Sequence, residues 1–343
     1  KENLGKETRV VTIGPAGEGR VSMATLLADN DASGSGGFGA VMGSKNLKAI
    51  AVQGSGKVQS ANPGRLTELN KDIHRLKKAS PAASVWGEGA VPDQKRRDMC
   101  RGCNVGCGRY VYRDKAGREG KFICGQVGFY QGRARKYYGD RDWKEVPFHA
   151  AMLGNDYGVD VFALGTLLMW LSRCHKAGIL TDEGTGLPLS EMGSLEFLDT
   201  LIRKMSSREG FGDVLADGLL RASEKVGHQS KQLISGDLAK DELGLAYDPR
   251  YYITTGLLYA MEPRMPIQQL HEIARPILSW VLWASGAKNA YVSTDVLRST
   301  AKRFWGTELA VDLSTYEGKA QTAVRIQDRR YVHESLILCD WAW

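Results

Sequence analysis

Cysteine is scarce in this sequence, and no hydrophobic run is long enough to cross a membrane. Six cysteines among 343 residues are too few for a disulfide scaffold, and three of them fall within eight residues, which predicts a reduced, cytoplasmic compartment. The apolar stretch at residues 161–171 is shorter than the roughly 20 residues of a membrane helix, which predicts no membrane span. The net charge of +7 is scattered without a nucleic-acid-binding signature, so we expect no nucleic-acid partner.

Short β-branched segments and glycine-rich turns are concentrated near the start of the chain. Residues 8–13 and 48–53 have the composition of strands, and glycine-rich turns lie between them at residues 14–19 and 34–39. The composition then shifts to Gly, Ser, Asn and Pro over residues 53–63, which predicts a linker. This opening is typical of the end of a β-rich domain.

Helical patterns dominate the rest of the chain. The periodicity of apolar residues predicts helices over residues 62–78, 160–177, 194–205, 212–226, 270–284 and 296–305. The fold class predicted is therefore α+β, with a β-rich N-terminal domain followed by two mainly helical domains. We place these domains at residues 1–55, 56–230 and 231–343.

Three cysteines close together carry the strongest chemical signal. Cys100, Cys103 and Cys107 form a C-x2-C-x3-C run, which suits one corner of a 4Fe–4S cluster better than the paired C-x2-C spacing of zinc sites. Zinc and unligated thiols remain alternatives. A cluster needs a fourth ligand, which would come from one of the remaining cysteines: Cys124, Cys174 or Cys339. Cys174 lies within an apolar helix pattern, where a structural thiol is the simpler interpretation.

Two glycine-rich segments, followed by the cysteine run, resemble the aldehyde ferredoxin oxidoreductase family. They are IGPAGEGRV at residues 13–21 and GGFGAVMGSKNLKAI at residues 36–50. The resemblance covers essentially the whole chain and implies an interior fragment of a longer protein. It also implies tungsten, or molybdenum, held by two pterins beside a 4Fe–4S cluster. Electrons would pass to ferredoxin or a partner subunit, in a homodimer or hetero-oligomer.

The resemblance assigns ligands to the cluster. Cys100, Cys103 and Cys107 correspond to the family's cysteine run, and its fourth cysteine ends a D-x-x-G-L-C motif. Residues 334–339 match that motif with Glu334 in place of Asp and Ile in place of Gly. This implies Cys339 as the fourth ligand and Glu334 as a pterin contact.

A paired D-x-x-G-L-D motif resembles residues 155–160. The resemblance implies cofactor contacts from Asn155, Gly158 and Asp160, with Asn in place of the leading Asp. The alternative is that Asn155 and Asp160 only cap the following helix. Upstream, Gly36, Gly37 and Gly39 would allow close backbone approach to the cofactor, although turns between strands often contain such glycines. Ser35 stands near the position where the family usually has an arginine.

Cys124 stands where aldehyde-oxidising members carry a glutamate. In this respect the chain is similar to the catalytic subunit of class II benzoyl-coenzyme A reductases, in which a cysteine binds tungsten. A soft thiolate suits such a metal, so we predict Cys124 as a tungsten ligand, with a buried structural thiol as the alternative. Glu262, Arg264 and His271 are candidates for the substrate pocket, with His271 as a proton donor or a structural histidine.

The function predicted is redox chemistry on an aldehyde, a carboxylic acid or an acyl-coenzyme A thioester. The main alternative is an electron-transfer or scaffold protein that holds an iron–sulfur cluster without tungsten. A further alternative is a zinc-stabilised basic interaction module.

Overall fold

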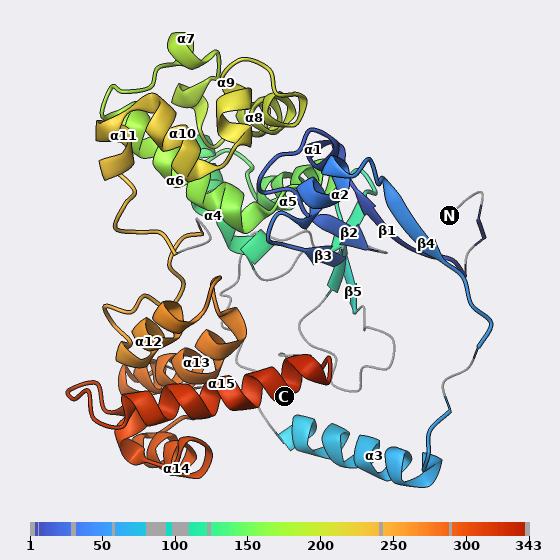
Figure 1. The fold of residues 1–343 in the computed structure, drawn as a ribbon, viewed down its shortest axis with the longest axis vertical. Coiled ribbons are helices and arrows are strands. Elements are labelled where there is room, and N and C mark those ends of the chain that lie inside the picture. Colours follow the sequence, from blue (N-terminus) through green and yellow to red (C-terminus); the bar gives the residue numbers. More distant parts are fainter. Residues whose placement is uncertain are drawn as a thin grey trace. The chain divides into compact units, whose positions relative to one another are not determined.

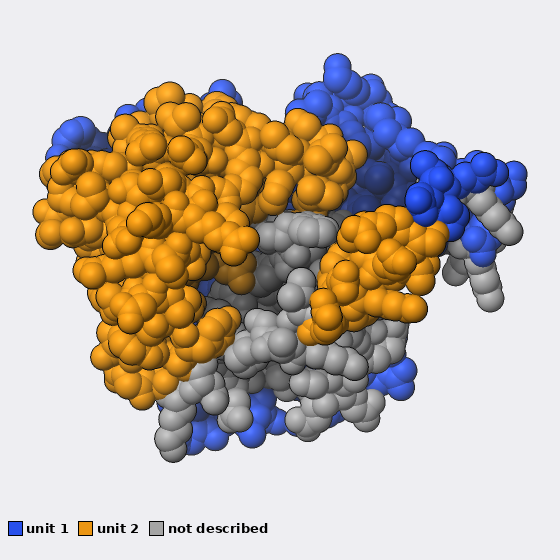
Figure 2. Space-filling view, turned by 90° about the horizontal axis from the view of Figure 1, so that it is seen from below, with its two compact units in different colours: residues 1–63, 86–237 blue, residues 64–85, 238–343 orange. Residues whose placement is uncertain are grey.

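The chain folds into two compact units. The computed structural model describes residues 4–5, 7–28, 32–56, 59–79, 94–97, 110–121, 125–239, 243–287 and 290–339 (Figure 1). The first unit comprises residues 1–63 and 86–237, and the second comprises residues 64–85 and 238–343 (Figure 2). The first two predicted domains therefore share one unit for the most part.

A four-stranded antiparallel sheet opens the first unit, in the order β3-β2-β1-β4. Its strands are β1 (Arg9–Ile13), β2 (Leu26–Ala28), β3 (Ala32–Gly34) and β4 (Ala49–Val52). Val11 pairs with Ala28 on one side and with Ile50 on the other. Two short helices, α1 (Pro15–Glu18) and α2 (Phe38–Ser44), occupy the glycine-rich connections. Both predicted strands are confirmed.

The rest of the first unit is mainly helical. Its helices are α4 (Gly125–Tyr138), α5 (Val146–Tyr157), α6 (Val161–Lys176), α7 (Asp182–Thr185), η1 (Leu189–Glu191), α8 (Leu195–Ser207), α9 (Phe211–Ala216), α10 (Leu219–Val226) and α11 (His228–Gln232). The buried Trp170 of α6 donates to the carbonyl of Ser230 at 3.0 Å. The prediction of one helix over residues 212–226 was wrong, because Gly218 adopts φ +102° and separates α9 from α10.

A second, three-stranded antiparallel sheet lies within the first unit, in the order β5-β6-β7. It consists of β5 (Gln94–Arg97), β6 (Tyr110–Arg113) and β7 (Glu119–Lys121). Tyr112 packs with Phe148, Ala151 and Met152 of α5. A side chain at Gly120 would place its Cβ 2.1 Å from the Met152 sulfur, so the β6–β7 hairpin lies directly on α5.

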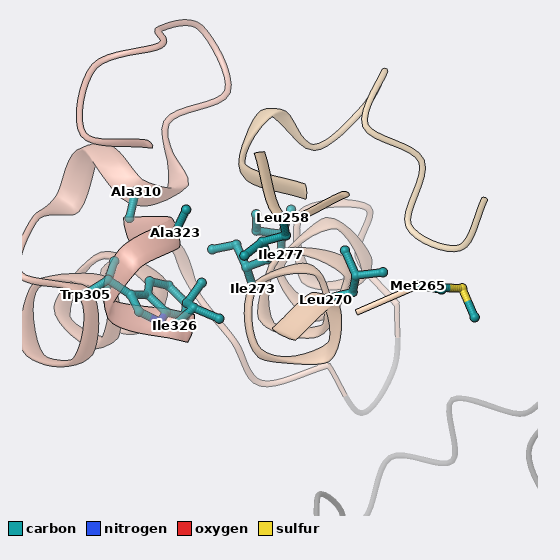
Figure 3. Close-up of a cluster of buried hydrophobic side chains, with 10 residues drawn as sticks. Leu258, Met265, Leu270, Ile273, Ile277, Trp305, Ala310, Ala323 and Ile326 are labelled. Carbon is teal, nitrogen blue, oxygen red and sulfur yellow. The ribbon is translucent and has the colours of Figure 1, made fainter. Parts of the chain in front are cut away.

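The second unit contains α3 (Pro63–Ala79), α12 (Ile253–Met261), α13 (Ile267–Ala284), α14 (Thr294–Trp305), η2 (Glu308–Val311) and α15 (Lys319–Ser335). Its core joins α12, α13, α14 and α15 through buried side chains that include Leu258, Ile273 and Trp305 (Figure 3). Glu272 accepts hydrogen bonds from Trp305 Nε1 at 3.0 Å and from Arg330 Nε at 2.6 Å. The Glu272 carboxylate is buried, and its two hydrogen bonds connect α13 to α14 and to α15.

Cys174 lies on the buried face of α6, and desolvation raises the pKa of its thiol to about 11. In the unfolded chain such a thiol ionises near pH 9, so the unfolded state loses its proton first as pH rises. The stabilisation from the buried neutral thiol is therefore complete below about pH 9 and disappears towards pH 11.

The free energy of unfolding should consequently lose a contribution of up to about 2 kcal/mol between those pH values. Urea denaturation of the wild type and of Cys174→Ala at about pH 8 and about pH 11 would measure it, because other titrating groups cancel in the difference. If the difference in the free energy of unfolding between the two proteins does not change with pH, the raised pKa of Cys174 is contradicted.

Candidate functional site

The turn that ends α5 contains the first predicted cofactor motif, residues 155–160. Gly158 adopts φ +72°, and its N–H donates to the carbonyl of Asn155 at 3.2 Å. The N–H of Val159 donates to the carbonyl of Gly154 at 2.8 Å. These two bonds form a Schellman-type helix end, in which glycine is the residue that adopts the left-handed conformation without strain.

The same turn is held against the N-terminal part of the first unit. The N–H of Thr25 donates to the carbonyl of Gly158 at 2.8 Å. A Cβ added to Gly14 would lie 2.4 Å from the carbonyl oxygen of Tyr157. Gly14 therefore allows two backbones to approach more closely than any side chain would permit.

The glycines at residues 36–39 contact the same N-terminal stretch. Gly37 adopts φ +76°, and a Cβ there would lie 2.7 Å from the carbonyl oxygen of Ser22. At Gly39 the corresponding distance to the carbonyl oxygen of Thr25 is 2.6 Å. Gly36 adopts φ +85°, and a Cβ there would meet only the ring of Phe38 at ordinary contact distance. Packing therefore accounts for Gly37 and Gly39, and a cofactor contact from these glycines stays a prediction.

Asn155 is a buried polar residue of this region, with 8% of its surface exposed. Its Oδ1 accepts a hydrogen bond from Nε2 of Gln126 at 3.2 Å. Its Nδ2 is buried and has no hydrogen-bond partner in the described part of the chain. A buried donor without a partner costs free energy, so a ligand acceptor at this atom would be favourable.

Asp160 caps α6. Its carboxylate accepts from the N–H of Phe162 at 2.8 Å and from the N–H of Ala163 at 3.4 Å, while its own N–H donates to the carbonyl of Met23 at 2.9 Å. The capping interpretation is confirmed for Asp160. A cofactor contact from its side chain stays a prediction.

Two partners of the first motif were not predicted from the sequence. Arg118, in the β6–β7 hairpin, donates to both carboxylate oxygens of Asp156 at 2.9 and 2.7 Å. Gln126 belongs to the first turn of α4. These two contacts bracket Cys124 in the sequence, although Cys124 itself lies outside the described residues.

The end of α15 repeats this turn in the second unit. The N–H of Ile337 donates to the carbonyl of Glu334 at 3.0 Å, and that of Leu338 to the carbonyl of His333 at 2.9 Å. Ile337 adopts φ +56°, a conformation that is strained for a β-branched residue and common for glycine. Cys339 follows with an exposed free thiol. The two motifs that resemble each other in sequence thus share one backbone conformation.

Three predicted residues come together at this end of α15. Glu262, 6% exposed, accepts hydrogen bonds through Oε1 from Gln327 Nε2 at 2.9 Å and from Tyr331 Oη at 2.8 Å. The hydrogen bond to Glu262 raises the pKa of Tyr331. Arg264 lies 3.8 Å from Glu334. Glu262 and Arg264, in the connection between α12 and α13, therefore both lie against α15, the helix that contains Glu334.

His271 has a different environment. Its ring meets Tyr247 edge-on at a centroid distance of 5.7 Å. Close by in the sequence, Oε1 of Gln268 and of Gln269 are buried without a hydrogen-bond partner among the described residues, a feature that sequence reasoning missed. The proton-donor role of His271 stays a prediction.

The predicted cluster ligands Cys100, Cys103 and Cys107 lie outside the described residues, as does Cys124. Within the described ranges, no group of three or more His, Cys, Asp or Glu side chains could hold a metal ion. In the same ranges, no helix is both long enough and apolar enough to span a membrane.

Comparison with known proteins identifies the class. The family model described as "Aldehyde ferredoxin oxidoreductase, domains 2 & 3" matches residues 43–343, and the model of the N-terminal domain of the same family matches residues 1–54. The chain belongs to the aldehyde ferredoxin oxidoreductase family. The family resemblance and the α+β fold predicted from the sequence are confirmed.

Curated relatives agree with this assignment. The tungsten-containing aldehyde ferredoxin oxidoreductase of Pyrococcus abyssi is 30% identical over 312 residues, which cover 77% of this chain and 49% of the relative. The "Aliphatic sulfonate oxidoreductase, WOR-like subunit" of Pyrococcus furiosus is 25% identical, covering 64% of this chain and 41% of the relative. The chain spans about half the length of the curated relatives it matches.

A solved structure shares the fold. The active site complex BamBC of benzoyl-coenzyme A reductase with 1,5-dienoyl-coenzyme A contains a chain that matches with a TM-score of 0.62 and 22% identity. The match covers 78% of this chain and 47% of that chain.

The contact between Gly14 and the α5 turn can be tested by Gly14→Ala. Because the new Cβ would overlap the Tyr157 carbonyl, the backbones must separate, and we expect a loss of about 2–4 kcal/mol in the free energy of unfolding. Gly132→Ala is the matched control. An added Cβ meets nothing within 4 Å at this α4 position, so alanine should stabilise by up to about 1 kcal/mol. Equal melting temperatures for both variants would contradict the close contact.

Proposed function

We propose that the chain forms part of a tungsten-pterin, iron–sulfur oxidoreductase. The substrate is an aldehyde, a carboxylic acid or an acyl-coenzyme A thioester, and electrons pass through a 4Fe–4S cluster to ferredoxin or a partner subunit. The observation that carries the proposal is the repeated turn at residues 155–160 and 334–339. Family membership and the tungsten-containing relatives support the same conclusion.

The residues of the first turn fit a pterin. Asn155 offers a buried Nδ2 donor that has no partner among the described residues, and a pterin carries acceptor oxygen and nitrogen atoms. The glycines at 37, 39 and 158 keep side chains away from the neighbouring backbone, and Gly36 adopts the left-handed conformation that glycine allows. In the second turn, Glu334 would contact the other pterin. When bound, the cofactor supplies two-electron redox chemistry at tungsten or molybdenum.

The cluster would be held by Cys100, Cys103, Cys107 and Cys339. The described thiol of this set, Cys339, is exposed, whereas Cys174 is buried in α6. Thiolate ligands bind iron, and an exposed thiol is accessible to a cluster, whereas a thiol packed inside a helix bundle is not. This contrast favours Cys339 over Cys174 as the fourth ligand. Cys124 is proposed as a further, soft ligand to tungsten.

Substrate chemistry is assigned to the second unit. Oxidising an aldehyde to an acid releases protons, and Glu262 is a carboxylate that can accept one. Gln327 and Tyr331 fix its Oε1, which holds the carboxylate in place. Arg264, 56% exposed, provides a cationic group for the carboxylate or the oxygen of a substrate. His271 is proposed as a proton donor.

The assignment of Cys339 can be tested by comparing Cys339→Ala with Cys174→Ala in the full-length protein purified without oxygen. We expect Cys174→Ala to retain about four iron ions per chain, and Cys339→Ala to lose most of them together with the cluster's visible absorbance. Melting temperatures measured in parallel identify any general loss of folding. Equal iron content in the two variants would contradict Cys339 as a ligand.

A further inference from the structure

Gln126 and Asn155 form an amide pair that joins two helices. Gln126 lies in the first turn of α4 and Asn155 in the last turn of α5, and they are 29 residues apart in the sequence. Nε2 of Gln126 donates to Oδ1 of Asn155 at 3.2 Å. Asn155 is buried, at 8% exposed, and Gln126 is half-buried.

This contact sets the orientation of the Asn155 amide relative to that of Gln126. A side-chain amide carries an acceptor on one side and a donor on the other. With Oδ1 engaged by Gln126, the atom left over is Nδ2, and it is buried without a partner among the described residues. Turning the Asn155 amide alone would place two donors face to face, because Gln126 presents its own Nε2 in this arrangement. In this arrangement the pair presents the Nδ2 donor of Asn155.

We infer that Gln126 is a positioning residue that directs Asn155 Nδ2 towards a hydrogen-bond acceptor of the bound pterin, a carbonyl oxygen or a ring nitrogen. The inference rests on the proposed function. In the family motif the leading residue is Asp, which can only accept a hydrogen bond when it is ionised. This chain thus offers the opposite polarity at the same position of the turn.

Isosteric substitutions separate donor from acceptor at this position. Asn155→Asp replaces the Nδ2 donor with a carboxylate oxygen and leaves the acceptor for Gln126 in place. Gln126→Glu removes the donor to Asn155 and supplies an acceptor, so that the Asn155 amide turns over and presents Oδ1. Gln126→Met removes the hydrogen bond without favouring either orientation. Gln131→Glu makes the same chemical change elsewhere on α4 and serves as the control.

The full-length protein would be produced in a host that makes the pterin, supplied with tungstate and purified without oxygen. Pterin and tungsten per chain are measured for each variant, together with the melting temperatures of the loaded and cofactor-stripped proteins. We expect Asn155→Asp and Gln126→Glu to lower cofactor occupancy under limiting supply about tenfold, which corresponds to about 1.4 kcal/mol. Gln126→Met should have a smaller effect, and Gln131→Glu none.

A purely structural role for Gln126 predicts another result. The cofactor-stripped Gln126→Met and Gln126→Glu proteins would then have melting temperatures lowered equally relative to the wild type. The two variants would also have the same cofactor occupancy, and that combined result would overturn the inference. Higher occupancy in Asn155→Asp than in the wild type would also overturn it, because the ligand atom would then be a donor. Wild-type protein without pterin would instead refute the proposed function, so the two failures can be distinguished.

Discussion

The close backbone contact between Gly14 and the α5 turn is the constraint on which the first unit's candidate site depends. Gly158 takes a left-handed conformation, Thr25 donates to its carbonyl, and the missing side chain of Gly14 leaves room for the carbonyl of Tyr157. If this turn moved, Asn155 would lose its place beside Gln126. Glycine is therefore needed at these positions to allow the backbone conformation and the close approach, while the polar side chains around the turn are the proposed cofactor contacts.

The second unit repeats the turn with different residues. Its left-handed position is occupied by Ile337, 92% exposed, where strain of about 1–2 kcal/mol is expected for a side chain with a Cβ. Strain of this kind persists only where surrounding interactions fix the backbone. Here the bonds to the carbonyls of Glu334 and His333 fix it, which leaves Cys339 directly after the turn.

Regular elements and family motifs were predictable from the sequence, whereas long-range partners were not. Hydrophobic periodicity was sufficient for α6 and α13, because each buries a continuous apolar face. The β6–β7 hairpin was missed because its strands are only four and three residues long, and β7 consists of Glu, Gly and Lys. Arg118 and Gln126 bind residues of the first motif that lie 38 and 29 residues further along the chain. A local sequence pattern cannot predict contacts over such separations. The similarity of the turns at residues 155–160 and 334–339 was predictable only from the family resemblance.

A chain that forms part of a tungsten-pterin, iron–sulfur oxidoreductase should be isolated with both the metal-pterin and the cluster. The most direct test is simultaneous analysis of iron, tungsten, molybdenum, zinc and pterin in the full-length protein, purified without oxygen from a host that makes the pterin. We expect about four iron ions per chain, with stoichiometric tungsten or molybdenum and pterin. Iron without tungsten, molybdenum or pterin would contradict it and indicate an electron-transfer protein, and zinc alone would contradict the redox function altogether.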